Sequence, residues 1–153
     1  MRVYVPGTAA DLRRGTLASS DAYAVTPALE AALPEDVAET REYVAYLGAV
    51  DDSAQLAAAV GAVPRRVVFA AEVATSAVRQ PESEPDAGGH PGLVRLRGPV
   101  AWRDVVAIHV DETAAEPDVT AAANGDSKAA RALEDRDLMW YDPSERDALI
   151  HSL

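Results

Sequence analysis

Short apolar runs separated by turn residues predict a sheet of short strands. Residues 67–71 and 105–108 are apolar at every position, which is typical of central strands covered on both faces. Residues 93–97 alternate apolar side chains with arginines, which indicates an edge strand protected by charge. The other predicted strands share β-branched or aromatic residues beside turn signals, and they are residues 3–5, 22–25 and 138–141.

A helical period of three and four residues is clearest in residues 34–47, where apolar side chains share one stripe. Gly48 predicts the end of this helix, and the capping pattern of Asp52 and Ser53 predicts the start of a second one. We expect the two helices to pack antiparallel over the sheet. Shorter helices are predicted where a capping residue precedes proline or acidic residues, near Thr8, Thr26, Glu116, Asp126 and Asp142.

These elements predict an α+β fold in a single domain, residues 1–153, which is long enough to bury a core without metals or disulfides. We expect a mixed, mostly antiparallel sheet of five or six strands with helices packed on it. Residues 80–92 contain prolines and glycines and no large apolar side chain, so they predict a flexible loop.

The charge balance excludes whole classes of partner. There are 25 acidic and 14 basic residues, and the formal net charge is −11. Such a chain is repelled by DNA, RNA and anionic membranes, so we expect no nucleic-acid or membrane partner. No apolar run is long enough to span a bilayer, and the apolar start is too short for a secretory signal, so we expect a cytoplasmic protein.

Residues with catalytic or ligating chemistry are sparse. The chain has no cysteine, which excludes disulfides, thiolate zinc sites and cysteine nucleophiles. His90, His109 and His151 show no metal-ligand spacing, and we interpret His109, within an apolar run, as structural. No phosphate-cradle or hydrolase motif is present. We therefore predict no metal and no cofactor, assign no catalytic residue, and favour a non-enzyme without excluding an enzyme.

Arginines and aromatic residues supply the remaining candidates for binding. Adjacent pairs such as Arg13-Arg14 and Arg65-Arg66 could contact a phosphate-bearing ligand, or they could form ion pairs with the acid-rich surface. Trp102 precedes Arg103-Asp104 and the pair Trp140-Tyr141 precedes Asp142, and such aromatics are enriched at the centres of protein interfaces. We take these three aromatics as candidate partner-binding residues.

Four segments resemble an uncharacterised family of small acidic actinobacterial proteins. They are MRVYVPGTAADLRRG, RRVVFAAEV, VRLRGPVAWRDVVAIHVDE and EDRDLMWYDPSERDAL, which together extend over nearly the whole chain. The resemblance implies a bacterial, cytoplasmic protein and carries no assigned activity.

The order of the predicted elements also resembles small bacterial domains of the ADP-ribosyltransferase type. That family has a histidine or arginine ahead of Gly-Thr on its first strand, whereas this chain has Tyr4 ahead of Gly7-Thr8. The resemblance, together with the adjacent arginines Arg13 and Arg14, implies a ligand cleft near the first two strands. Its candidate lining residues are Tyr4, Thr8, Arg13, Tyr23 and Glu72.

Two principal hypotheses for function follow. The leading one is a non-enzymatic cytoplasmic protein that binds a protein partner or itself. The alternative is a small enzyme or nucleotide-binding domain with the cleft described above. A third hypothesis is that the acidic surface mimics nucleic acid and blocks a DNA-binding protein. It requires carboxylates in spaced rows, and the sequence does not define their positions on the surface.

Overall fold

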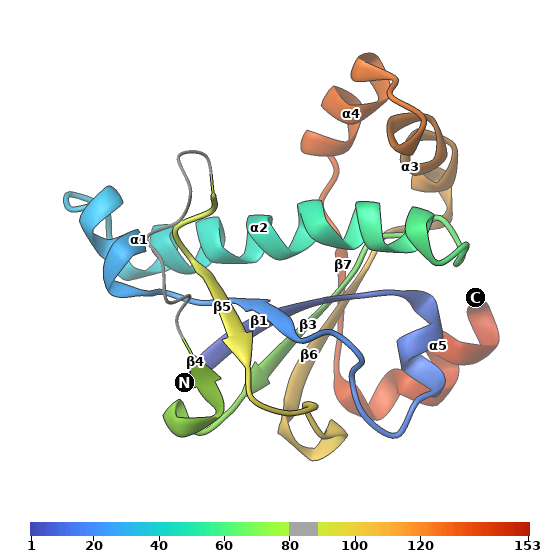
Figure 1. Ribbon diagram of the computed structural model, residues 1–153. Coiled ribbons are helices and arrows are strands. Elements are labelled where there is room, and N and C mark those ends of the chain that lie inside the picture. The colour runs from blue at the N-terminus through green and yellow to red at the C-terminus, as the bar shows by residue number, and fades with distance from the viewer. Residues whose placement is uncertain (80–88) are drawn as a thin grey trace.

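The computed structural model describes residues 1–79 and 89–153. In these ranges the strands form one open sheet in the order β4-β5-β2-β1-β3-β6-β7 (Figure 1). The strands are β1 (Arg2–Gly7), β2 (Asp21–Tyr23), β3 (Val67–Glu72), β4 (Val78–Arg79), β5 (Leu93–Leu96), β6 (Val105–Val110) and β7 (Met139–Tyr141). Every neighbouring pair is antiparallel. The predicted α+β class is confirmed, with seven strands among the described residues instead of five or six.

The helices differ greatly in length and in their contact with the sheet. They are α1 (Pro27–Ala32), α2 (Ala38–Ala59), α3 (Glu116–Ala123), α4 (Ser127–Glu134) and α5 (Arg146–Ser152). Thr26 caps α1 by accepting a hydrogen bond from the Leu29 amide, and Asp126 caps α4 in the same way, as the sequence predicts. The helix predicted after Thr8 is a 3₁₀ turn, Ala9–Arg13.

The prediction of two helices in residues 34–60 is wrong, because α2 is continuous for 22 residues. Gly48 does not end the helix. It lets α2 approach β2, since a Cβ at this position would come within 2.5 Å of the Tyr23 ring. Nor does Asp52 cap a new helix: its carboxylate accepts a hydrogen bond of 2.5 Å from the Tyr23 hydroxyl.

Ser53 joins α2 to the end of the two central strands. It is fully buried, its hydroxyl donates to the Gly7 carbonyl at 2.8 Å, and it accepts from the Val67 amide at 2.7 Å. Gly7 and Val67 face each other in the register of β1 and β3. The side chain of a polar residue on α2 therefore satisfies two backbone groups at the end of the β1–β3 ladder.

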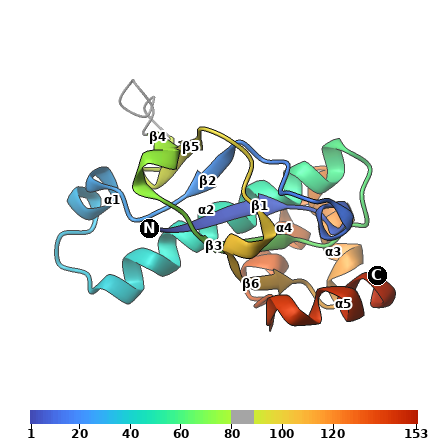
Figure 2. The same cartoon turned by 90° about the horizontal axis from the view of Figure 1, so that it is seen from below.

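The sheet buries a different apolar cluster on each face. One face packs against α2, which lies along the sheet, and buries Tyr23, Leu29 and Val68 (Figure 1). The opposite face centres on Phe69 and packs against the Ala9–Arg13 turn and α5. Seen from below, β1 and β3 cross in front of α2 (Figure 2). Helices α3 and α4 pack on each other around a third, small cluster and form a hairpin beside the C-terminal half of α2.

Most of the loop predicted at residues 80–92 lies outside the described residues. At its end, the Gly92 amide donates to Nδ1 of His90, whose Nε2 therefore carries the proton and donates to the Val44 carbonyl. The His90 ring also packs edge-on against Tyr23, with ring centroids 5.0 Å apart. No helix in the described part of the chain is long and apolar enough to cross a membrane.

Replacing Ser53 by alanine tests whether α2 is anchored through this hydroxyl. Ser53→Ala leaves a buried carbonyl and a buried amide without their shared partner, so we expect the free energy of unfolding to fall by about 1–3 kcal/mol. Urea denaturation measures the change. The exposed Ser76 provides the control, because Ser76→Ala removes no buried hydrogen bond and should change stability by less than about 0.5 kcal/mol.

Candidate functional site

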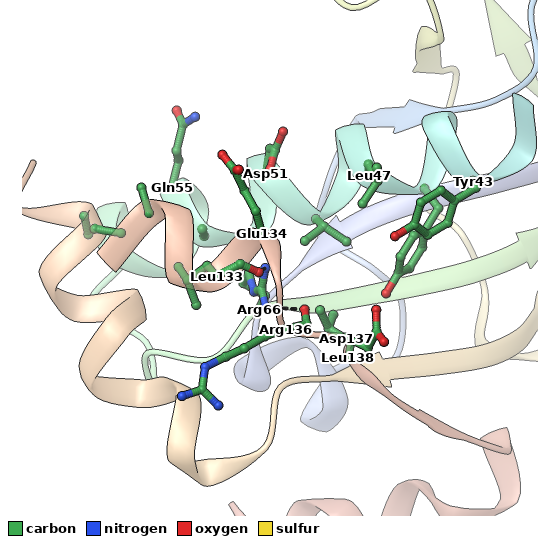
Figure 3. Close-up of a pocket in the computed structure, with 16 residues that line it drawn as sticks. Tyr43, Leu47, Asp51, Gln55, Arg66, Leu133, Glu134, Arg136, Asp137 and Leu138 are labelled. Carbon is green, nitrogen blue, oxygen red and sulfur yellow. Dashed lines mark hydrogen bonds between the residues drawn. The ribbon is translucent and has the colours of Figure 1, made fainter. Parts of the chain in front are cut away.

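A groove of about 660 Å³ separates α2 from the hairpin of α3 and α4 (Figure 3). Gln55 stands at one end of this groove and Tyr43 at the other. Its volume lies within the range of small-molecule and side-chain binding sites. The groove is lined by Tyr43, Tyr46, Leu47, Val50, Asp51, Ala54, Gln55, Arg66, Ala122, Ala123, Ala130, Leu133, Glu134, Arg136, Asp137 and Leu138.

The floor of the groove is a buried ion pair between Arg66 and Asp111. Both side chains are at least 95% buried, and the guanidinium donates from Nε and Nη2 to the two carboxylate oxygens, each at 2.8 Å. The Arg66 amide donates to the same carboxylate. Arg66 stands just before β3 and Asp111 just after β6, so the pair closes the ladder between these strands.

The same guanidinium fixes the hairpin. Arg66 donates from Nη1 to the Leu133 carbonyl at 3.0 Å and from Nη2 to the Arg136 carbonyl at 3.1 Å. Leu133 lies in the last turn of α4, where carbonyls lack a partner inside the helix, and Arg136 follows two residues after the helix ends. One buried side chain thus ties the central sheet to the far wall of the groove and sets its width.

The second arginine at the groove is also used by the fold. Arg136 directs its side chain away from the groove (Figure 3) and binds Asp118 and Glu112, with nitrogen–oxygen distances of 3.1 and 2.8 Å. Neighbouring Arg65, outside the groove, pairs with Glu116 at 2.7 Å. The arginines that line the groove are therefore neutralised by carboxylates of the hairpin and its base.

Tyrosines form one wall of the groove. The Tyr43 and Tyr46 rings stack with centroids 6.0 Å apart, and Tyr46 contacts His109 on β6 at 5.0 Å. Burial raises the pKa of Tyr46 to about 12, so its hydroxyl is protonated at neutral pH. Trp140 faces His109 across the β6–β7 ladder, so both side chains project from the α2 side of the sheet.

Three carboxylates of the groove have no partner in the described part of the chain. No ion pair or side-chain hydrogen bond there engages Asp51, Glu134 or Asp137. Asp51 and Glu134 extend from facing helices (Figure 3). Burial raises the pKa of Asp51, and the nearby carboxylates add to this shift while Arg66 opposes it. The groove thus combines an aromatic wall with uncompensated negative charge.

No group of three metal-ligating side chains occurs among the described residues. The polar groups that the groove itself offers are tyrosine hydroxyls, one amide and carboxylates, which suit hydrogen-bond donors and cations.

Two of the candidate ligand residues lie side by side under α2. Tyr4 and Tyr23 are partners in the β1–β2 ladder. Tyr4 donates a 2.5 Å hydrogen bond to Glu42, as Tyr23 does to Asp52. Burial and these carboxylates raise the pKa of both hydroxyls. Neither tyrosine lines the groove.

The other three candidate ligand residues lie apart from them. Thr8 is buried at the end of β1 and donates to Asp11. Arg13 donates to the Ile150 carbonyl in α5. Glu72 ends β3 at the opposite end of the ladder, where its hydrogen bond from Arg2 lowers its pKa. The structure pairs the two tyrosines and does not bring Thr8, Arg13 and Glu72 together with them.

The three aromatics predicted to bind a partner have different surroundings. Trp102 is half-buried, donates to the Arg14 carbonyl and lies 3.8 Å from the Arg146 guanidinium. Tyr141 packs against the core of the α5 face. Trp140 is 60% exposed on the edge strand β7. Only Trp140 of the three is presented to solvent as the prediction requires.

Sequence reasoning did not assign the groove residues to a site. The apolar stripe predicted in residues 34–47 includes Leu47, and Tyr43 flanks it, but the pattern places this helix over the sheet and does not indicate a groove. The four-residue spacing of Tyr43 and Leu47 is the sequence signal for a second apolar face on this helix. The far wall comes from the hairpin, which begins more than 50 residues after α2 ends.

The comparisons with known proteins give a family and no activity. A family model described as a family of unknown function (DUF6912) matches residues 1–150. The chain belongs to this family. No curated protein and no solved structure matches the chain. The expected membership of a family without assigned activity is confirmed, whereas the likeness to ADP-ribosyltransferases stays a prediction.

Substitutions at the groove floor test the role of the buried ion pair. Arg66→Ala leaves the Asp111 carboxylate buried without its partner, and we expect a loss of about 3–5 kcal/mol in the free energy of unfolding. Arg66→Met combined with Asp111→Leu leaves no buried charge unpaired and should cost less than Arg66→Ala. The control, Arg2→Ala, breaks an exposed pair with Glu72 and should cost at most about 1 kcal/mol. Equal effects at the two arginines would contradict a buried anchor.

The pH dependence of stability tests the environment of His109. Burial lowers its pKa from 6.5, so below that pH the unfolded chain binds a proton that the folded chain resists. The free energy of unfolding should fall between about pH 7 and about pH 5, and we expect this fall, measured by urea unfolding, to be smaller in His109→Gln. The exposed His151 is the control, and His151→Gln should leave that loss unchanged.

Proposed function

We propose that this protein is a non-enzymatic binding module that docks a protein partner in the groove between α2 and the α3–α4 hairpin. The observation that carries the proposal is the exposure of large apolar residues beside the groove. Tyr43 and Leu47 on α2 and Trp140 on β7 are 52%, 37% and 60% exposed. Aromatic residues in such positions act as interface anchors.

The position of these residues supports a docking role. Tyr43 and Leu47 lie one turn apart on α2 and line the groove. Leu138 lines it from the segment that enters β7, and Trp140 follows two residues later on the same face of the sheet. A partner seated in the groove would therefore extend onto an edge strand, where unpaired backbone groups are also available.

The proposal places function at the groove and not at the first two strands. Helix α2 lies over Tyr4 and Tyr23, and its carboxylates already engage both hydroxyls. The groove instead offers polar groups that the described part of the chain leaves without partners. We place this role in the cytoplasm, where a chain without cysteine needs no oxidising surroundings to fold.

Site-specific photo-crosslinking in cells of the source organism tests the proposal. A benzophenone amino acid at position 47 should form an adduct of defined mass with one partner, because this position lines the groove. Val37 is the control, since it is 62% exposed at the N-cap of α2 and does not line the groove. Trp140→Ala should reduce the adduct. An adduct of twice the protein's own mass would identify the partner as a second copy.

The proposal fails if position 47 gives no adduct of defined mass. It also fails if position 37 gives the same adduct in the same yield, because contact would then not be confined to the groove.

A further inference from the structure

We propose that the group this groove receives is the guanidinium of an arginine flanked by apolar residues on the partner. This inference rests on the proposed function and specifies the chemistry of the partner. It follows from three properties of the groove: its free charge, its aromatic wall and its apolar lining.

The free charge of the groove is negative. Arg66 and Arg136 are each bound to carboxylates of the fold, so they contribute no available positive charge. Asp51, Glu134 and Asp137 engage no other side chain in the described ranges. A positively charged group would be attracted to them, and a phosphate or carboxylate would be repelled.

The aromatic wall favours a guanidinium over an ammonium. The stacked rings of Tyr43 and Tyr46 present a π surface, and a planar guanidinium stacks on such surfaces more readily than the compact, strongly hydrated lysine ammonium. Neither tyrosine hydroxyl has a hydrogen-bond partner within the described residues, so both can accept from guanidinium N–H groups. The carboxylates of Asp51, Glu134 and Asp137 can accept from the other donors.

The apolar lining suits the rest of the partner segment. Leu47 and Leu138, with the buried Val50 and Leu133 beneath them, provide an apolar surface for the aliphatic part of an arginine side chain. The volume of about 660 Å³ exceeds what one such side chain fills, so neighbouring apolar residues of the partner would enter too.

The fold already contains one arginine bound in this way. The Arg146 guanidinium lies 3.8 Å from the centroid of the Trp102 ring. It also donates to the carbonyls of Leu12 and Arg14, at 2.7 and 2.6 Å. An aromatic face combined with oxygen acceptors therefore holds a guanidinium within this same chain, and the groove repeats that combination with carboxylates as the acceptors.

A titration with two matched peptides, followed by nitrogen-15 NMR of the full chain, tests the inference. The probes are acetyl-Ala-Leu-Arg-Leu-Ala-amide and the same peptide with citrulline, a neutral isostere, in place of arginine. We expect the arginine peptide to shift the amide signals of Tyr43, Leu47 and Glu134. It should bind at least about fivefold more tightly than the citrulline peptide, because partly screened ion pairs each contribute a factor of about two to five.

Charge-neutralising variants locate the binding. The groove variant Asp51→Asn, Glu134→Gln, Asp137→Asn should weaken the arginine peptide by about tenfold. The matched control, Glu35→Gln, Asp36→Asn, Glu39→Gln, removes three charges near the start of α2, outside the groove, and should leave the affinity unchanged. The NMR spectra of the free variants show whether each is folded.

Three results would overturn the inference: no shift with the arginine peptide at millimolar concentration, equal affinity for the two peptides, or equal weakening by the groove and control variants. The crosslink from position 47 is independent of all three. If it forms while both peptides bind equally, the partner docks by apolar contact alone, and the proposed function stands without this inference. If the arginine peptide binds in the groove and no crosslink forms, the groove recognises guanidinium and the proposed function fails.

Discussion

The bidentate pair of Arg66 and Asp111 is the interaction on which the rest of this structure depends. It lies where β3 and β6 meet, and its remaining guanidinium N–H groups reach the carbonyls of Leu133 in α4 and of Arg136 just after it. Burying two charges is costly unless both are fully hydrogen-bonded, and here the hydrogen bonds come from three separate parts of the chain. The sheet, the hairpin and the groove between them therefore share one polar contact.

Local signals predicted much of the fold, and long-range contacts explain where they failed. The strands at residues 67–71 and 105–108 and the caps at Thr26 and Asp126 follow from propensity and hydrogen bonding near each residue. The break predicted in α2 does not occur, because Gly48 and Ser53 serve contacts with β strands distant in sequence. A glycine or a buried serine has the same local signature whether it ends a helix or joins it to a sheet.

The candidate site was less predictable than the fold for the same reason. Trp102 and Trp140 both lie within two positions of a charged residue in the sequence, yet Trp102 is held by Arg146 and the Arg14 carbonyl while Trp140 is exposed. Exposure depends on which elements cover a residue. The two walls of the groove come from segments more than 50 residues apart, and only the tertiary structure places Asp51 opposite Glu134.

The hairpin has a small apolar cluster of its own, formed by Ala115, Val119 and Leu133 and separate from the two clusters of the sheet. Substitutions in that cluster, or insertions at the tip near Gly125, would move one wall of the groove without disturbing the packing around Phe69 or under α2. The architecture thus separates the packing that maintains the sheet from the packing that shapes the groove. Remodelling the hairpin would change the shape of the groove while the sheet stays the same.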